Sequence, residues 1–161
     1  MFATPICYEE EETPIMGSRN HSYVQANLII ALDKLEHFAV YSELSLEIEG
    51  LEYKPDVCIY PLDHGVESFL DDIIRMQEMP LLAIEILSPR QFSQIIIDKF
   101  KAYFKAGIQS CWLVIPNAKT VLVYNDLEIV IPFSSGILID PKLQISIPLQ
   151  AIFREQRLKR S

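Results

Sequence analysis

The sequence predicts a single α/β domain in which a mixed sheet is flanked by helices. Apolar residues recur at spacings of three and four over residues 18–38 and again over residues 91–106, the spacing of one helical face. Apolar runs of strand length, residues 81–87 and 111–115, lie before and after the second helix. A strand, a helix and a strand in succession indicate two parallel strands joined by a crossover.

The remaining elements follow from local patterns. Strict alternation over residues 44–49 predicts a half-buried strand, and Gly50 predicts a hairpin turn into a second strand that contains Asp56. A short helix is expected over residues 66–78, and Gly107 is expected at the end of the second helix. The last elements predicted are strands at residues 120–124, 128–133 and 136–139 and a short helix at residues 149–157.

Length and composition set the domain boundaries. The chain has 161 residues, half of them hydrophobic, which is enough to bury the core of one domain. Residues 1–16 are expected to be irregular and residues 17–153 to form the folded domain. Residues 154–161 are expected to form a basic tail.

Charge, hydrophobicity and cysteine content indicate which binding partners, cellular compartment and metal sites to expect. The net charge of −8 disfavours nucleic-acid binding, because phosphate contacts dominate that affinity. No apolar run approaches the roughly 18–20 residues that span a bilayer, so no membrane partner is expected. The cysteines, Cys7, Cys58 and Cys111, are odd in number and far apart, which predicts a reducing cytoplasm and no zinc site.

Two carboxylates stand in strand-like apolar surroundings. Glu85 lies in the middle of the run Leu-Leu-Ala-Ile-Glu-Ile-Leu, where an ionised side chain loses hydration unless a cation or donor compensates it. Asp56 belongs to another short apolar run. Carboxylates presented by neighbouring strands are the ligands that a hard divalent cation requires, so the pair predicts a metal site.

A lysine on the second helix is predicted to face these carboxylates. At about 100° per residue, Lys99 falls in the centre of the apolar stripe, whereas Lys101 and Lys105 fall on the opposite side. An isolated lysine in this position could extend past the stripe to water. Because Glu85 lies on the strand just before this helix, an ion pair between Lys99 and Glu85 is the preferred interpretation.

Taken in order, Pro55-Asp56, Glu85-Ile86-Leu87 and Lys99 resemble the PD-(D/E)xK nuclease superfamily, and more closely its Uma-two family of putative restriction endonucleases. The resemblance covers most of the chain, and its more specific part is the Glu-x-Leu-Ser-Pro run followed by Lys99 and Tyr103. The sequence departs from the pattern at two positions. Leu87 stands where the superfamily has its strand lysine, and Ile95 stands where family members often carry aspartate.

The resemblance implies a restriction-endonuclease-like fold and an Mg²⁺-dependent endonuclease that hydrolyses DNA phosphodiester bonds. It implies that Asp56, Glu85 and the backbone carbonyl of Ile86 hold Mg²⁺, for which Mn²⁺ can substitute, and that Lys99 orients or activates the attacking water. The expected products are a 5′-phosphate and a 3′-hydroxyl, and a homodimer is expected by analogy of fold. The alternatives are a non-catalytic binding or assembly module of the same fold and a metal-dependent hydrolase of another phosphate ester.

His21 has two interpretations. It shares the apolar stripe of the first helix and lies in its first turn, so it faces inward. It is either a core or capping histidine or an accessory residue of the site, close to the metal or the phosphate.

Overall fold

The structure is a computed structural model and describes residues 17–155. The expected irregular segment, residues 1–16, lies outside the described residues, as do residues 156–161 of the expected basic tail. None of the helices in the described part is long and apolar enough to cross a membrane.

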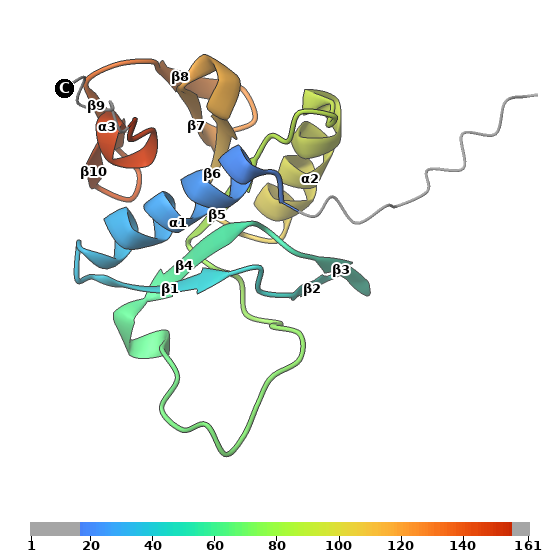
Figure 1. Ribbon diagram of the computed structural model, residues 1–161. Coiled ribbons are helices and arrows are strands. Elements are labelled where there is room, and N and C mark those ends of the chain that lie inside the picture. The colour runs from blue at the N-terminus through green and yellow to red at the C-terminus, as the bar shows by residue number, and fades with distance from the viewer. Residues whose placement is uncertain (1–16, 156–161) are drawn as a thin grey trace, which may run out of the picture.

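A six-stranded mixed sheet forms the centre of the domain (Figure 1). The order across the sheet is β1 (Phe38–Ser42), β4 (Val57–Pro61), β5 (Leu82–Ile86), β6 (Ser110–Ile115), β7 (Thr120–Asp126) and β8 (Ile129–Phe133). Strands β5 and β6 are parallel, and every other neighbouring pair is antiparallel. The predicted single α/β domain with a mixed sheet is confirmed, as is the parallel pair on either side of the second helix.

Separate layers cover the two faces of the sheet. Helix α1 (Arg19–Asp33), the β9 (Ile137–Asp140) and β10 (Ile145–Pro148) hairpin and α3 (Leu149–Ile152) pack on one face. Helix α2 (Ser93–Lys105) and strand β2 (Leu46–Ile48), which pairs with β3 (Leu51–Tyr53), pack on the other. Because side chains alternate along β5, Ile84 and Ile86 join the first core, and Ala83 joins the second. Glu85 points to the α2 side, where it contacts Tyr103.

The predicted hairpin at Gly50 is confirmed, but Asp56 lies outside it. Glu49 and Gly50 have φ values of 51° and 77°, as a two-residue turn with two left-handed residues requires. The expected second strand is divided into β3 and β4 by residues 54–56. Pro55 has no backbone N–H to contribute to a strand pairing, so the pairing is interrupted there and Asp56 lies just before the first residue of β4.

Two element predictions are wrong, and one strand was not predicted. The first helix ends at Asp33, not near residue 38, because Glu36 adopts a left-handed φ of 59° and turns the chain into β1. Residues 66–78 contain no helix, because Met76 forms its backbone hydrogen bonds with Ser45 and Glu47 beside β2. Strand β10 is present but was not predicted. The short helix expected at residues 149–157 is α3, which ends at Ile152, and Arg157 lies outside the described residues.

Candidate active site

Glu85 is a buried carboxylate in the centre of the site. It lies on β5 with 4% of its surface exposed. Its Oε1 accepts a hydrogen bond of 2.6 Å from the hydroxyl of Tyr103, and its Oε2 lies 3.7 Å from Nζ of Lys99. Burial raises the pKa of Glu85 to about 7, and the charge of Asp56 adds to this rise, while Lys99 and the Tyr103 hydrogen bond oppose it. The carboxyl group of Glu85 therefore ionises less readily than that of an exposed glutamate.

Helix α2 supplies both partners of Glu85 from one edge of its buried face. Lys99 and Tyr103 are four residues apart, so they lie one above the other on the helix. Lys101 and Lys105 pair instead with Asp98 and Glu49, on the exposed side. The lysine predicted to face the carboxylates is thus the one that reaches Glu85.

The predicted place of Lys99 in the centre of the apolar stripe needs correction. Phe92 and Ile95, whose spacing places them beside Lys99 on that stripe, are exposed, and the buried residues of α2 are Ile96, Phe100 and Tyr103. Lys99 therefore lies at the edge of the buried face, with 32% of its side chain exposed. A lysine at this edge can contact Glu85 and a molecule arriving from solvent at the same time.

Asp56 stands beside Glu85 because of the strand register. Val57 pairs with Ile84 in the antiparallel β4–β5 ladder, and one further step along that register sets Asp56 opposite Glu85. Asp56 Oδ2 accepts a hydrogen bond of 2.6 Å from the backbone N–H of Ile86. The Ile86 peptide and the two carboxylates are thereby brought together at one end of the two strands.

His21 belongs to this group and is not only a core or capping histidine. The hydroxyl of Ser18 caps α1 by accepting from the backbone N–H of His21, at 3.2 Å. The ring points to the sheet, with Nε2 3.2 Å from Asp56 Oδ1, and Nδ1 is buried with no hydrogen-bond partner among residues 17–155. The hydrogen bond with Asp56 raises the pKa of His21, against the effect of burial, and the charges of Asp56, Glu43 and Glu85 add to this. Protonated His21 would hold the Asp56 carboxylate in place.

Sequence reasoning missed three residues of the site. Tyr103 belongs to the run that resembles the family but was given no role, although its place one turn after Lys99 indicates that it too can reach Glu85. Gln25, one turn after His21, donates a hydrogen bond of 3.0 Å to the backbone carbonyl of Asp56. The backbone N–H of Glu43 donates to the same carbonyl at 3.1 Å. No pattern in the sequence indicates that last contact, which depends on a left-handed φ of 51° at Glu43.

The carboxylate oxygens of Asp56 and Glu85 are ligands of the kind that a hard divalent cation prefers. Each carboxylate oxygen of Asp56 and Glu85 has one partner, which leaves lone pairs for a cation. Among residues 17–155, no group of three or more His, Cys, Asp or Glu side chains is placed to hold a metal ion. An ion here would therefore complete its shell with the Ile86 carbonyl, water and substrate oxygens, as Mg²⁺ usually does.

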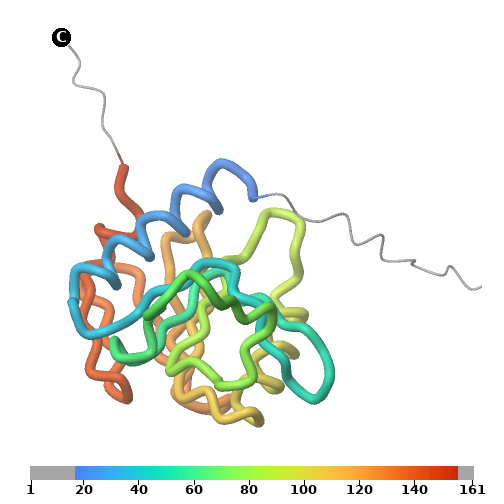
Figure 2. The backbone as a smooth tube through the Cα atoms, turned by 90° about the horizontal axis from the view of Figure 1, so that it is seen from below, coloured from blue at the N-terminus to red at the C-terminus, as the bar shows by residue number. Residues whose placement is uncertain are grey.

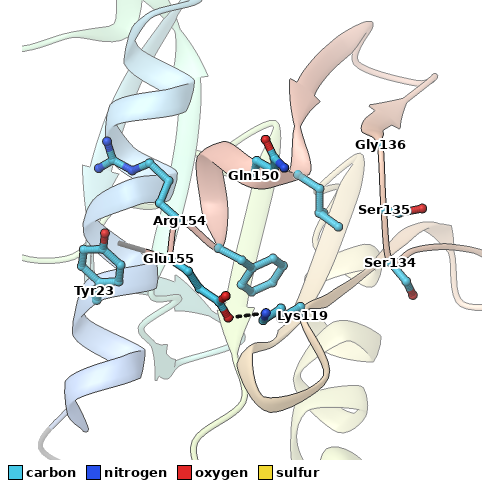
Figure 3. A pocket seen from close by; sticks show the side chains of 10 residues that line it. Tyr23, Lys119, Ser134, Ser135, Gly136, Gln150, Arg154 and Glu155 are labelled. Atoms are coloured by element: carbon cyan, nitrogen blue, oxygen red, sulfur yellow. Dashed lines mark ion pairs between the residues drawn. The ribbon is translucent and has the colours of Figure 1, made fainter. Parts of the chain in front are cut away.

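A cavity of about 740 Å³ lies away from this site. It is lined by Tyr23, Lys119 and Arg154, among others (Figure 3). Glu155 forms an ion pair with Lys119 at its edge. Neither Asp56 nor Glu85 lines it, so the site is recognised by its chemistry and not by the depth of a pocket.

Comparison with known proteins identifies the family. Residues 9–142 match the Uma2 family, which is described as "Putative restriction endonuclease". The chain belongs to the Uma2 family. The match includes Asp56, Glu85 and Lys99, so the suspected family relationship is confirmed. No curated protein matches the chain.

A solved structure supports the fold. The crystal structure of a putative nuclease belonging to DUF820 from Anabaena variabilis ATCC 29413 superposes with a TM-score of 0.69. It is 20% identical in sequence, and the match covers 84% of this chain and 81% of that chain. At this identity the likeness bears on the fold alone, and it confirms a nuclease-like fold.

Proposed function

We propose that this Uma2 protein is an Mg²⁺-dependent endonuclease that hydrolyses phosphodiester bonds of DNA. The observation that carries the proposal is the buried Glu85 beside Asp56, with Lys99 from α2 3.7 Å from Glu85 Oε2. Two carboxylates that can hold a divalent ion, with a lysine beside them to stabilise charge on the phosphate, suit metal-assisted phosphodiester hydrolysis. The description of the family supports the same activity.

Asp56, Glu85 and the backbone carbonyl of Ile86 are the groups that would hold the ion, with Mn²⁺ as a substitute for Mg²⁺. When bound, the ion would supply Lewis-acid polarisation of the phosphoryl oxygen and stabilise the leaving oxygen. Its positive charge would also favour the ionised form of Glu85, whose pKa of about 7 reflects burial near another carboxylate.

Lys99 is proposed as the catalytic residue that contacts the reacting atoms. Its ammonium group would orient the attacking water and offset negative charge on the phosphate. Water would attack the phosphorus atom while the bond from phosphorus to the 3′ oxygen breaks. The water gives up a proton and the leaving oxygen gains one, so the products are a 5′-phosphate and a 3′-hydroxyl.

Tyr103 and His21 are proposed as positioning residues. Tyr103 fixes Glu85 through Oε1, which leaves Oε2 directed at Lys99. His21 holds Asp56 through Oδ1, while the Ile86 N–H holds Oδ2. With each carboxylate held by two groups, neither has to reorganise when substrate arrives.

Two other functions are alternatives to this one, and each predicts a different experimental result. A non-catalytic binding module would keep the fold and bind DNA without cutting it. A hydrolase of another phosphate ester would act on small phosphodiesters and leave DNA intact. The net charge of −8 is the feature that favours these alternatives.

A plasmid cleavage assay tests the proposal. Supercoiled plasmid, linear DNA, RNA and bis-p-nitrophenyl phosphate are incubated with the protein in Mg²⁺, Mn²⁺ or EDTA, beside the Glu85→Gln variant. The expected result is metal-dependent nicking or cutting of DNA that Glu85→Gln abolishes. DNA that stays intact in both metals, or cutting that survives Glu85→Gln, would reject the proposed site.

A further inference from the structure

A long loop between β4 and β5 exposes several large apolar side chains to solvent. This apolar loop, residues 62–76, follows β4 and includes the short turn η1 (Leu62–His64). The exposed fractions are 94% for Leu70, 93% for Phe69 and 87% for Ile74, and Leu62, Val66 and Ile73 are each more than half exposed. Scattered exposed apolar residues are ordinary, but six within one segment of this length are not.

The loop is held at its base and extends at its tip. The Tyr41 hydroxyl donates to the backbone carbonyl of His64 at 2.9 Å, and Nε2 of the His64 ring lies 3.0 Å from Glu78 Oε1. At the returning end, Met76 exchanges backbone hydrogen bonds with Ser45 and Glu47 beside β2. Between these anchors the chain extends away from the sheet in Figure 1 and lies nearest the viewer in Figure 2. The contacts at its base thus hold the loop in place, while its apolar side chains are exposed to solvent.

The charges of the loop indicate which classes of binding partner are disfavoured. Glu67, Asp71 and Asp72 are exposed among the apolar residues. Arg75 at the end of the loop is paired with Glu52 at 3.5 Å. A surface with these charges repels nucleic-acid phosphates and anionic lipid headgroups. Anionic partners are therefore disfavoured, and a second copy of the chain, which carries the same carboxylates, has to associate through the apolar side chains against a repulsion that salt screens.

The surface is complementary to itself. Val66, Phe69 and Ile73 line a hollow of about 430 Å³, together with Tyr41 and Leu44. Glu67, Asp71 and Asp72 also line it. Leu70 and Ile74 do not line this hollow and are almost fully exposed beside it. A two-fold contact brings the same patch of both copies together, so a patch with a hollow and protruding apolar side chains can fill itself.

The area agrees with a dimer. At about 100 Å² of apolar surface for each side chain, the six residues offer on the order of 600 Å². A standard interface buries roughly 800 Å² on each partner, of which a little over half is non-polar. The apolar loop alone therefore supplies the apolar part of such an interface.

We propose that the apolar loop is the surface through which two copies of this chain form a symmetric dimer. The loop joins the ends of β4 and β5 that lie opposite the Asp56 and Glu85 end, so both sites stay open in the dimer. The proposal does not depend on nuclease activity. It gives the homodimer expected from the nuclease resemblance a specific contact.

Sedimentation equilibrium from 1 to 100 µM tests the proposal on the full chain. The expected species has twice the 18.5 kDa mass of the chain. The double variant Leu70→Asp, Ile74→Asp should weaken association by about 100-fold or more, as the loss of two buried anchors does. The matched control is Leu51→Asp, Ile137→Asp, two exposed apolar residues on β3 and β9, and it should associate like the parent. Circular dichroism checks that both variants fold.

The salt dependence of association tests whether the contact is apolar, and hydrogen exchange locates it. Each copy carries a net charge of −8, so added NaCl should strengthen the dimer by screening repulsion. Residues 66–74 should gain protection from exchange as concentration rises. A monomer at 100 µM, or a dimer that persists in Leu70→Asp, Ile74→Asp, overturns the proposal. Weakening by salt does so as well, because it indicates attraction between charges in place of apolar contact.

Discussion

The hydroxyl of Tyr103 donates a hydrogen bond of 2.6 Å to Oε1 of Glu85, and both residues are buried. The phenol has its pKa raised far above its usual range by burial and by the neighbouring Glu85 charge, so it stays protonated and can donate to Glu85. Helix α2 thus reaches the sheet with two donors, Tyr103 and Lys99, one for each oxygen of the same carboxylate. This double contact fixes how Glu85 is presented at the site.

Replacing Tyr103 by Phe should destabilise the fold, and more at high pH than at low pH. The folded-state pKa of Glu85 is about 7 against an ordinary value of 4.5, so its contribution to stability is complete below pH 4.5 and is lost as pH rises through 7. Because the Tyr103 hydrogen bond favours the ionised form, its removal leaves a buried carboxylate oxygen without a partner, at a cost of about 1–3 kcal/mol above pH 7.

Urea unfolding of Tyr103→Phe at pH 5 and pH 8 measures this difference. Tyr23→Phe serves as the control, because Tyr23 is 43% exposed and its change should stay within about 0.5 kcal/mol. Equal losses for Tyr103→Phe at both pH values would contradict the assigned hydrogen bond.

Replacing Lys99 by Met should lower DNA cleavage by about 100-fold or more, while Lys101→Met should change it little. Lys99 reaches Glu85, whereas Lys101 lies on the exposed side of α2, 3.3 Å from Asp98. The effect of Lys99→Met on stability can have either sign, because the change removes one charge and leaves Glu85 less compensated. Similar cleavage rates for the two variants, measured on supercoiled plasmid, would contradict the catalytic assignment of Lys99.

The site was predictable from sequence where strand and helix periodicity determine direction. The alternation of β5 turns Glu85 toward α2, and the spacing of α2 turns Lys99 to the same side. Asp56 was assigned to a strand, but its actual place before β4 still brings it beside Ile86, because the strands are neighbours. Contacts made by irregular backbone were not predictable, and Glu43 is an example, since its left-handed φ is set by the turn between β1 and β2.

The fold was predicted least well where tertiary contacts override local pattern. In residues 66–78 the apolar spacing is compatible with a helix, yet Met76 pairs with Leu46 and the segment stays irregular. Strand β10 was missed because its four residues form a strand through their pairing with β9, which the local sequence does not show. Local propensity predicts neither outcome, because it is a weak guide where a long-range pairing competes.

Adding Mg²⁺ to the metal-free protein should raise its stability by mass action, by about 2.7 kcal/mol at 100 times the dissociation constant. The gain should be larger at pH 8 than at pH 6, because a proton competes for Glu85 below its pKa of about 7. Asp56→Asn should abolish the shift, and EDTA should reverse it in the parent protein. Differential scanning calorimetry measures the effect, and an undiminished shift in Asp56→Asn would place the ion elsewhere.

A second buried carboxylate, Asp140, stabilises the fold away from the site. It ends β9 and is fully buried. Its Oδ2 accepts from the Ser110 hydroxyl and from Trp112 Nε1, the latter at 2.8 Å. Its Oδ1 accepts from Asn125 Nδ2 at 2.9 Å and from the backbone N–H groups of residues 142 and 143. One carboxylate therefore ties the β9–β10 hairpin to β6 and β7.

Replacing Asp140 by Asn should lower the free energy of unfolding by about 3 kcal/mol, as expected when one partner of a buried charged network is removed. The amide keeps the size of the side chain but turns an NH₂ group toward donors such as Trp112 Nε1, so at least one donor loses its acceptor. Cleavage activity per folded molecule should not change, because none of these contacts involves Asp56, Glu85 or Lys99. Asp33→Asn, at the exposed end of α1, is the control and should stay within about 0.5 kcal/mol. Urea unfolding compares the two variants, and a loss below 1 kcal/mol for Asp140→Asn would show that the hairpin is held mainly by its apolar contacts with the first core, through Leu138 and Ile145.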